Sequence, residues 1–334
     1  PEKVIGRYSE GDTGRGRIVV KVINGTESFA ETGRPVAVTL GFFDGVHRGH
    51  QALLATLREK AHDHGALPVA LTFDSHPFRV VCPHRLPPMI MTLTERLRHL
   101  ETLGIEVVVV QPFDQSFARM SAEEFLTTVL LSRLRASLIV GGYDTHFGRD
   151  GAGGLDMLRE KAEERGYHFY EVPPYHINGR ICSSTAIRQA LQRGDFDAAR
   201  IYLGRPWSVW AHVVRGRGVG RSIGYPTANL EAKYLVMPPA GVYASRIEID
   251  GTWYGGLMYA GTRPTFADGG QETACEVYIT DFSGDLYDAW VRVQPLVYLR
   301  GEERFESIDA LRAQISRDLA RAHDMMEDGI NGAQ

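Results

Sequence analysis

Cysteine, long apolar runs and net charge are all scarce in this sequence, and each shortage argues against a class of protein. The 334 residues include three cysteines, Cys82, Cys182 and Cys275, too few and too scattered for a disulfide framework or a cysteine metal site. No apolar stretch approaches the ~20 residues of a membrane span. The net charge of -4 gives no reason to expect nucleic acid or anionic lipid as a partner. We therefore expect a cytoplasmic protein with reduced thiols, no membrane and no nucleic acid.

The length favours two domains, because single cores rarely grow beyond ~250–300 residues. The polar, glycine-rich start predicts a flexible N-terminal arm over residues 1–34. A change of pattern near residue 206 then divides the rest into a first domain, 35–187, linker helices, 188–206, and a second domain, 207–334.

The first domain alternates short apolar strands with amphipathic helices, which predicts an α/β, Rossmann-like fold with a parallel sheet. The strands are expected at 35–40, 67–73, 105–110, 137–142 and 167–173. One helix has Leu53, Leu54, Leu57 and Ala61 on one face. Two others begin at capping boxes formed by Thr92 with Glu95 and by Ser121 with Glu124. Ligands are expected at the carboxyl ends of the strands.

The second domain has short strands rich in valine, isoleucine and aromatic residues, separated by turns rather than helices. They are expected at 207–214, 241–250, 252–260, 274–280 and 289–299, and predict an antiparallel β-barrel. A terminal helix with Leu311, Ile315, Leu319 and Ala322 on one face is expected to cover one side of this barrel.

The decapeptide GFFDGVHRGH lies where the first strand passes into a helix, an arrangement that directs free backbone N–H groups at a phosphate. His47 and His50 can donate hydrogen bonds to a triphosphate and stabilise charge that develops on it. The residues expected to contact the nucleotide are Gly41, Phe43, Asp44, Gly45 and Gly49. A tight turn capped by Asp44 with two solvated histidines is one alternative. A metal pair from the two histidines is another, although no third ligand is obvious.

Two further segments are expected near the same edge of the sheet. TFDSHP follows the second strand and brings Asp74 and His76 there. CSSTAIR opens a short helix with hydroxyl groups and an arginine that suit phosphate oxygens, although simple helix capping is an alternative. Its expected phosphate-binding residues are Ser183, Ser184, Thr185 and Arg188.

The second domain contains its own glycine-rich segment, GRGVGRSIGYPTANL, which can form a flap over phosphates. Thr227 and Asn229 lie two residues apart on an extended stretch, so both side chains point the same way and offer hard oxygen donors to Mg²⁺. An ordinary glycine-rich barrel loop is the alternative. The flap residues expected to contact nucleotide are Gly216, Gly218, Gly220, Arg221, Gly224 and Pro226.

In their order, GFFDGVHRGH, TFDSHP and CSSTAIR resemble the adenylyltransferase half of the prokaryotic bifunctional riboflavin kinase/FAD synthetase family, and PTAN resembles the riboflavin kinase signature. The resemblance implies a nucleotidyltransferase domain and a kinase barrel. ATP and Mg²⁺ would be used, riboflavin would be phosphorylated to FMN, and FMN would be adenylylated to FAD with release of pyrophosphate. Glu276 matches the catalytic glutamate of the kinase, while Asp74, His76, Asp144 and Arg300 match positions near flavin.

Five positions depart from the family pattern: Thr145, Gly151, Val219, Tyr259 and Tyr278. In the family, arginine is common at the position of Gly151 and usual at that of Val219. Two positive charges are therefore missing near phosphate-binding loops. One alternative is therefore a paralogue with a single activity, or one that acts on a modified flavin or another small acceptor. Another is a non-catalytic flavin-binding sensor or carrier. The sequence leaves open the oligomeric state, the flavin specificity and the passage of FMN between the sites.

Overall fold

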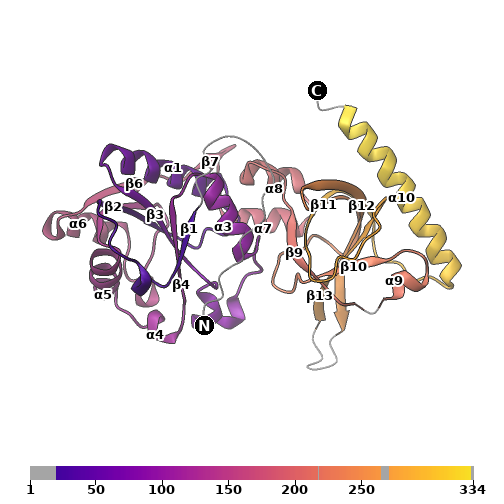
Figure 1. The fold of residues 1–334 in the computed structure, drawn as a ribbon, viewed down its shortest axis with the longest axis horizontal. Coiled ribbons are helices and arrows are strands. Elements are labelled where there is room, and N and C mark those ends of the chain that lie inside the picture. The colour runs from indigo at the N-terminus through magenta and orange to yellow at the C-terminus, as the bar shows by residue number, and fades with distance from the viewer. Residues whose placement is uncertain (1–19, 217, 265–270, 332–334) are drawn as a thin grey trace.

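The computed structural model describes residues 20–216, 218–264 and 271–331, which form two units joined by short helices (Figure 1). The first unit is built on a six-stranded sheet of order β1-β4-β3-β2-β5-β6, all parallel. Its strands are β1 Lys21–Asn24, β2 Val36–Leu40, β3 Leu67–Phe73, β4 Val107–Gln111, β5 Ala136–Gly142 and β6 His168–Val172. This confirms the predicted parallel α/β sheet.

Helices cover both faces of this sheet. On one face lie α1 Arg48–Asp63 and α3 Leu93–Thr102. The predicted apolar face of α1 is confirmed, because Leu53, Leu54, Leu57 and Ala61 are all buried. On the other face lie the π-helical segment Phe125–Arg133 and α6 Leu155–Arg165. Shorter elements complete the unit: η1 Thr26–Ser28, α2 Phe78–Val81, η2 Pro83–Arg85, α4 Gln115–Ala118, α5 Ala122–Glu124, η4 Arg149–Gly151, β7 His176–Ile177 and β8 Arg180–Ile181.

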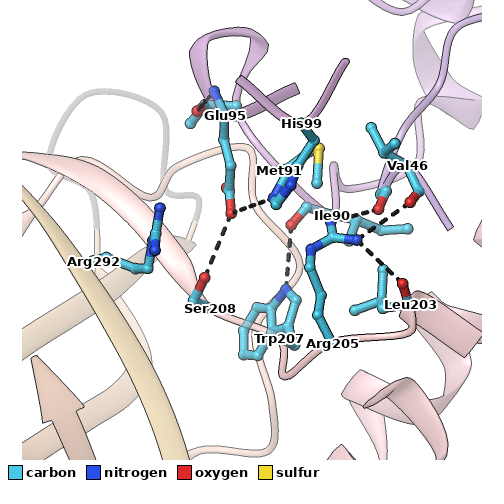
Figure 2. Close-up of polar contacts among 12 residues, drawn as sticks. Val46, Ile90, Met91, Glu95, His99, Leu203, Arg205, Trp207, Ser208 and Arg292 are labelled. Carbon is cyan, nitrogen blue, oxygen red and sulfur yellow. Dashed lines mark hydrogen bonds and ion pairs between the residues drawn. The ribbon is translucent and has the colours of Figure 1, made fainter. Parts of the chain in front are cut away.

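Two expectations for the first unit need correction. The N-terminal arm was expected to reach residue 34, but β1 lies within it and pairs in parallel with β4 as an edge strand; residues 1–19 of that arm lie outside the described residues. The Thr92 cap is formed, since its Oγ1 accepts from the Glu95 N–H at 3.2 Å. The Glu95 carboxylate, however, accepts from Ser208 of the second unit at 3.4 Å and lies 3.8 Å from His99 Nε2 of the same helix (Figure 2).

The second unit is a closed antiparallel barrel of order β10-β13-β12-β11-β14-β9, as predicted. Its elements are β9 Val209–Val214, α9 Val219–Ser222, β10 Thr227–Leu230, β11 Gly241–Ile249, β12 Thr252–Pro264, β13 Gln271–Ile279 and β14 Trp290–Arg300. The terminal helix α10, Ile308–Asn331, lies on the side of the barrel away from the first unit (Figure 1). Ile315, Leu319 and Ala322 pack on the barrel wall, which confirms the expected cover.

The linker helices are α7 Ser184–Gln192 and α8 Phe196–Leu203. Ile187, Leu191 and Leu203 belong to the same buried cluster as the barrel interior, and Ile90 of the first unit joins it. The Trp207 indole N–H donates to the Ile90 carbonyl at 3.2 Å, and this hydrogen bond joins the start of the barrel to the first unit (Figure 2). In the described part of the chain, no helix is both long and apolar enough to cross a membrane.

Candidate active sites

The strand order of the first unit reverses between β2 and β5, and such a reversal leaves a crevice at the carboxyl ends of the two strands. GFFDGVHRGH follows β2 and leads into the N-terminus of α1. Residues 143–154 follow β5 at the same edge. The structure therefore places the glycine- and histidine-containing turn at the position where α/β folds of this kind bind ligands.

Two stacked imidazole rings mark this turn. The rings of His47 and His50 lie 3.6 Å apart between centroids and are inclined by 18°. His47 is the N-cap of α1, because its Nδ1 accepts from the His50 N–H at 3.3 Å. The proton of a neutral His47 ring is therefore on Nε2, which leaves an N–H donor. Asp44 does not cap the helix, so the alternative of an Asp44-capped turn is wrong.

Both imidazoles stay uncharged at neutral pH. Burial, together with the positive charges of Arg205 and Arg188, lowers the pKa of His47 to about 3. Burial also lowers the pKa of His50 well below its usual range, and neighbouring His47 and Arg96 act in the same direction. The pair can thus donate neutral hydrogen bonds to a phosphate without first losing a proton.

The polar groups expected to contact phosphate are partly engaged within the protein. The Asp44 carboxylate accepts from the Ile90 N–H at 3.0 Å and pairs with Arg188 Nη2 at 2.6 Å. Ser184 Oγ donates to the Asp44 carbonyl at 2.8 Å. Ser183 caps α7 through the Ala186 N–H, as the capping alternative expects. The described contacts of these groups fix GFFDGVHRGH against CSSTAIR, which brings the two motifs side by side.

A cavity of about 510 Å³ lies next to this turn, between the two units. Asp74 and His76 of TFDSHP line it, and the His76 ring packs edge-on against Phe42 at 4.8 Å. Burial lowers the pKa of His76 to about 4, helped by the charges of Arg188 and Arg96. Side chains of the second unit also line the cavity: Ala211, His212, Glu231, Lys233, Tyr234, Leu235 and Trp290.

Sequence reasoning missed Arg96, a cation buried at this cavity. It is 3% exposed, donates to the carbonyls of Phe42 and Phe73, and lies over the Phe42 ring at 4.3 Å. Burial lowers its pKa to about 10, so it keeps its charge at neutral pH. The signal was present in the helix pattern, because Arg96 lies on the same face as Leu93 and Leu100.

The second candidate site lies on adjacent barrel strands. Thr227 Oγ1 donates to Glu276 Oε2 at 3.0 Å, and Asn229 lies directly opposite Glu276 in the β10–β13 register. The two PTAN side chains and the glutamate therefore share one face. These oxygen donors suit Mg²⁺, which usually takes few protein ligands and completes its shell with water and substrate phosphate. Across the described ranges, no group of three or more His, Cys, Asp or Glu side chains could hold a metal ion.

The glycine-rich segment covers this second site closely. A Cβ at Gly216 would lie 2.1 Å from Asn229 Nδ2, and one at Gly220 would lie 2.3 Å from the Tyr225 carbonyl oxygen. Helix α10 holds the same segment, since Tyr225 Oη and Ser316 Oγ are 2.7 Å apart and Arg312 donates to the Ile223 carbonyl. Glycine is thus required where the segment crosses the site.

The other predicted residues have different surroundings. Thr185, Arg221, Gly218, Gly224 and Pro226 are exposed, as is Asp144 beyond β5. Gly41, Gly45 and Gly49 pack against Phe43, Ile90 and His47 respectively. Arg300 pairs with Asp318 of α10 at 2.8 Å and so joins β14 to the terminal helix.

Comparisons with known proteins agree with this two-site arrangement. A family model described as FAD synthetase matches residues 30–186, and one described as riboflavin kinase matches residues 203–326. The bifunctional riboflavin kinase/FMN adenylyltransferase of Pseudomonas fluorescens is 35% identical over 303 residues, 91% of this chain and 97% of that protein. The chain belongs to this bifunctional family. The Bacillus subtilis member is 33% identical over 289 residues, 85% of this chain and 90% of its own length.

A solved structure described as a macrolide-efflux protein from Streptococcus pneumoniae has the same fold. It is 33% identical, with a TM-score of 0.75, and the match covers 90% of this chain and 97% of that one. The match extends over both units, so their pairing in one chain occurs in that protein as well.

The five departures from the family pattern lie in different surroundings. Thr145 is buried after β5, and Gly151 has a φ of +66°. Tyr259 lies opposite Glu276 across β12 and β13 and donates to Glu302. Tyr278 packs edge-on against Tyr225 of the flap at 5.4 Å between centroids. The side chain of the fifth, Val219, lies outside the described residues.

Proposed function

We propose that the chain makes FAD in two steps at two separate sites, phosphorylating riboflavin in the barrel and adenylylating FMN in the α/β unit. The observation that carries the proposal is the presence of both sets of groups in one chain: the Thr227–Glu276 contact under a glycine flap, and the neutral His47–His50 pair at a helix N-terminus. Membership of the bifunctional family supports the same assignment.

In the kinase step, Glu276 removes the proton from the ribityl 5′-hydroxyl of riboflavin. The hydroxyl oxygen forms a bond to the γ-phosphorus of ATP, and the bond from that phosphorus to the β–γ bridging oxygen breaks to release ADP. Thr227 holds the carboxylate by its hydrogen bond, and Thr227 and Asn229 would hold Mg²⁺. When bound, the metal neutralises charge on the phosphates.

In the adenylyl step, a phosphate oxygen of FMN attacks the α-phosphorus of ATP, and the bond to the α–β bridging oxygen breaks. Pyrophosphate leaves and FAD remains, with no covalent enzyme intermediate. The His47 Nε2–H and the free N–H groups of α1 stabilise the charge on the phosphates during attack. Catalysis then depends on positioning and charge stabilisation rather than on a protein nucleophile.

We also infer that the cavity between the units receives the isoalloxazine ring of FMN. Its volume of about 510 Å³ is in the range of small-molecule sites. Phe42, Met91 and Tyr234 supply apolar and aromatic contact area, while Asp74 and Arg96 supply polar groups. The cavity adjoins the turn that carries His47, so a flavin in it would direct its phosphate toward that turn.

The proposal is tested by incubating the purified full-length chain with riboflavin, ATP and Mg²⁺ and separating the flavins by chromatography. We expect FMN to appear first and FAD to follow, and FMN supplied directly to give FAD. Tight flavin binding with no product would favour the sensor or carrier, and a single product would favour the paralogue with one activity. A panel of modified flavins tests the remaining alternative, which normal kinetics with riboflavin and FMN would contradict.

A further inference from the structure

The turn before α1 contains a residue in an unfavourable backbone conformation. Val46 has a φ of +40°, in the left-handed region that β-branched side chains avoid, and its side chain is 1% exposed. Such a conformation persists only where the surroundings hold it in place. Because His47 is the next residue, whatever holds Val46 also sets the position of the N-capping imidazole.

Two side chains hold this turn by its carbonyl groups. Arg205, from the loop between α8 and β9, donates to the Gly45 carbonyl at 2.7 Å and to the Val46 carbonyl at 3.2 Å. Gln51, one turn into α1, donates to the Val46 carbonyl at 2.8 Å. Arg205 also donates to the Leu203 carbonyl at the end of α8, at 3.2 Å (Figure 2). Gln51 donates to the same carbonyl at 2.9 Å.

These bonds orient the peptide group that leads into His47. In a planar trans peptide the C=O and N–H point in opposite directions. With the Val46 carbonyl held on Arg205, the His47 N–H points away from the guanidinium, whereas the Val46 N–H donates within the turn to the Phe43 carbonyl at 3.0 Å. A residue outside both signature motifs thereby fixes main-chain groups of GFFDGVHRGH.

We propose that Arg205 is a positioning residue for adenylyl transfer, holding the Gly45 and Val46 carbonyls so that the His47 imidazole and its N–H are preset for the triphosphate. This inference rests on the proposed adenylyltransferase function. The hydrogen bonds of Arg205 within the described chain all go to main-chain carbonyls, so the guanidinium acts as a three-way clamp between the linker and the turn.

The test compares Arg205→Gln and Arg205→Lys with the unaltered full-length chain, measuring FMN to FAD and riboflavin to FMN separately. We expect Arg205→Gln to lower kcat for FAD formation by about ten- to a hundredfold, because misplaced groups act mainly on the transition state. KM values for FMN and ATP should stay within about threefold and the kinase step within about twofold. Lysine, which can still donate to one carbonyl, should retain more activity than glutamine.

Arg200→Gln, which removes an exposed cation from the same linker, is the matched control and should leave both activities unchanged. Added guanidinium ion should partly restore FAD formation to Arg205→Ala. If Arg205→Gln does not fold, Gln51→Ala removes the second clamp and should show the same selective loss.

Unchanged FAD formation in the glutamine variant, or equal loss of both activities in a folded variant, would overturn the inference. Failure of the inference about Arg205 can be told from failure of the proposed function, because in the latter case the unaltered chain would make no FAD.

Discussion

Replacing His47 by asparagine separates its titration from its capping role. The His47 ring is 6% exposed, and its Nδ1 accepts the His50 N–H at the start of α1. Asparagine is a strong N-cap, because its side-chain oxygen accepts the same kind of bond, and it does not titrate. His47→Asn should therefore keep the helix start and remove a buried group whose charge state differs between the folded and unfolded chain.

The size of the effect follows from the pKa of about 3 for His47 in the folded chain, against an ordinary value near 6.5. Between these values the unfolded chain binds a proton that the folded chain does not, so stability falls as the pH falls. From pH 7 to pH 5 the loss is about 2 kcal/mol. Arg205, Arg188, His50 and Cys182, which all act on or face the ring, are present in both proteins.

Urea denaturation at pH 7, 6 and 5 measures this difference. Far-UV circular dichroism is the appropriate signal, because all four tryptophans lie in the second half of the chain. The unaltered protein should lose about 2 kcal/mol more stability than His47→Asn over this range. His62→Asn, which removes an exposed histidine from the same helix, is the control. Parallel pH dependence in the unaltered protein and His47→Asn would refute the reasoning.

Three further substitutions test the two sites. Glu276→Gln should lower kcat for riboflavin phosphorylation at least about a hundredfold, because the proton acceptor is lost, while FMN to FAD conversion stays within about twofold; Glu306→Gln, an exposed glutamate, is the control. Tyr234→Ala should raise KM for FMN in FAD formation about tenfold by removing one wall of the cavity, with KM for riboflavin unchanged. Gly220→Ala would place a Cβ 2.3 Å from the Tyr225 carbonyl oxygen, so it should displace the flap and lower kinase activity at least about tenfold. Equal loss of kinase activity in Gly154→Ala, where φ is −158° and a Cβ comes no nearer than 3.6 Å to another atom, would contradict that reading.

The fold was predictable wherever the information is local. The spacing of Leu53, Leu54, Leu57 and Ala61 identifies the buried face of α1, because a helix brings such positions together whatever surrounds it. Alternation along β10 likewise put Thr227 and Asn229 on one face. β1 carried no comparable signal: its four residues become a strand by pairing with β4, more than 80 residues away.

The candidate sites were predictable in their location but only partly in their contacts. Asp44 was expected at phosphate, yet its carboxylate meets the Ile90 N–H and Arg188, partners 46 and 144 residues away. Glu95 has the local sequence pattern of a capping box, but its carboxylate accepts a hydrogen bond from Ser208 of the second unit. Glu276 came only from the family resemblance, since one glutamate on a strand has no local feature that distinguishes a base from a surface charge.

The departures from the family pattern affect the two sites differently. In the barrel, Tyr259 donates to Glu302 and Tyr278 packs against the flap residue Tyr225, and the Thr227–Glu276 contact is formed beside them. An aromatic pair of this kind contributes about 0.5–1.5 kcal/mol, so we expect a substitution at Tyr278 to act through the position of the flap residue Tyr225. Gly151 differs in kind, because its φ of +66° would strain an arginine at that position. An arginine introduced at position 151 would have to adopt this left-handed conformation or shift the loop.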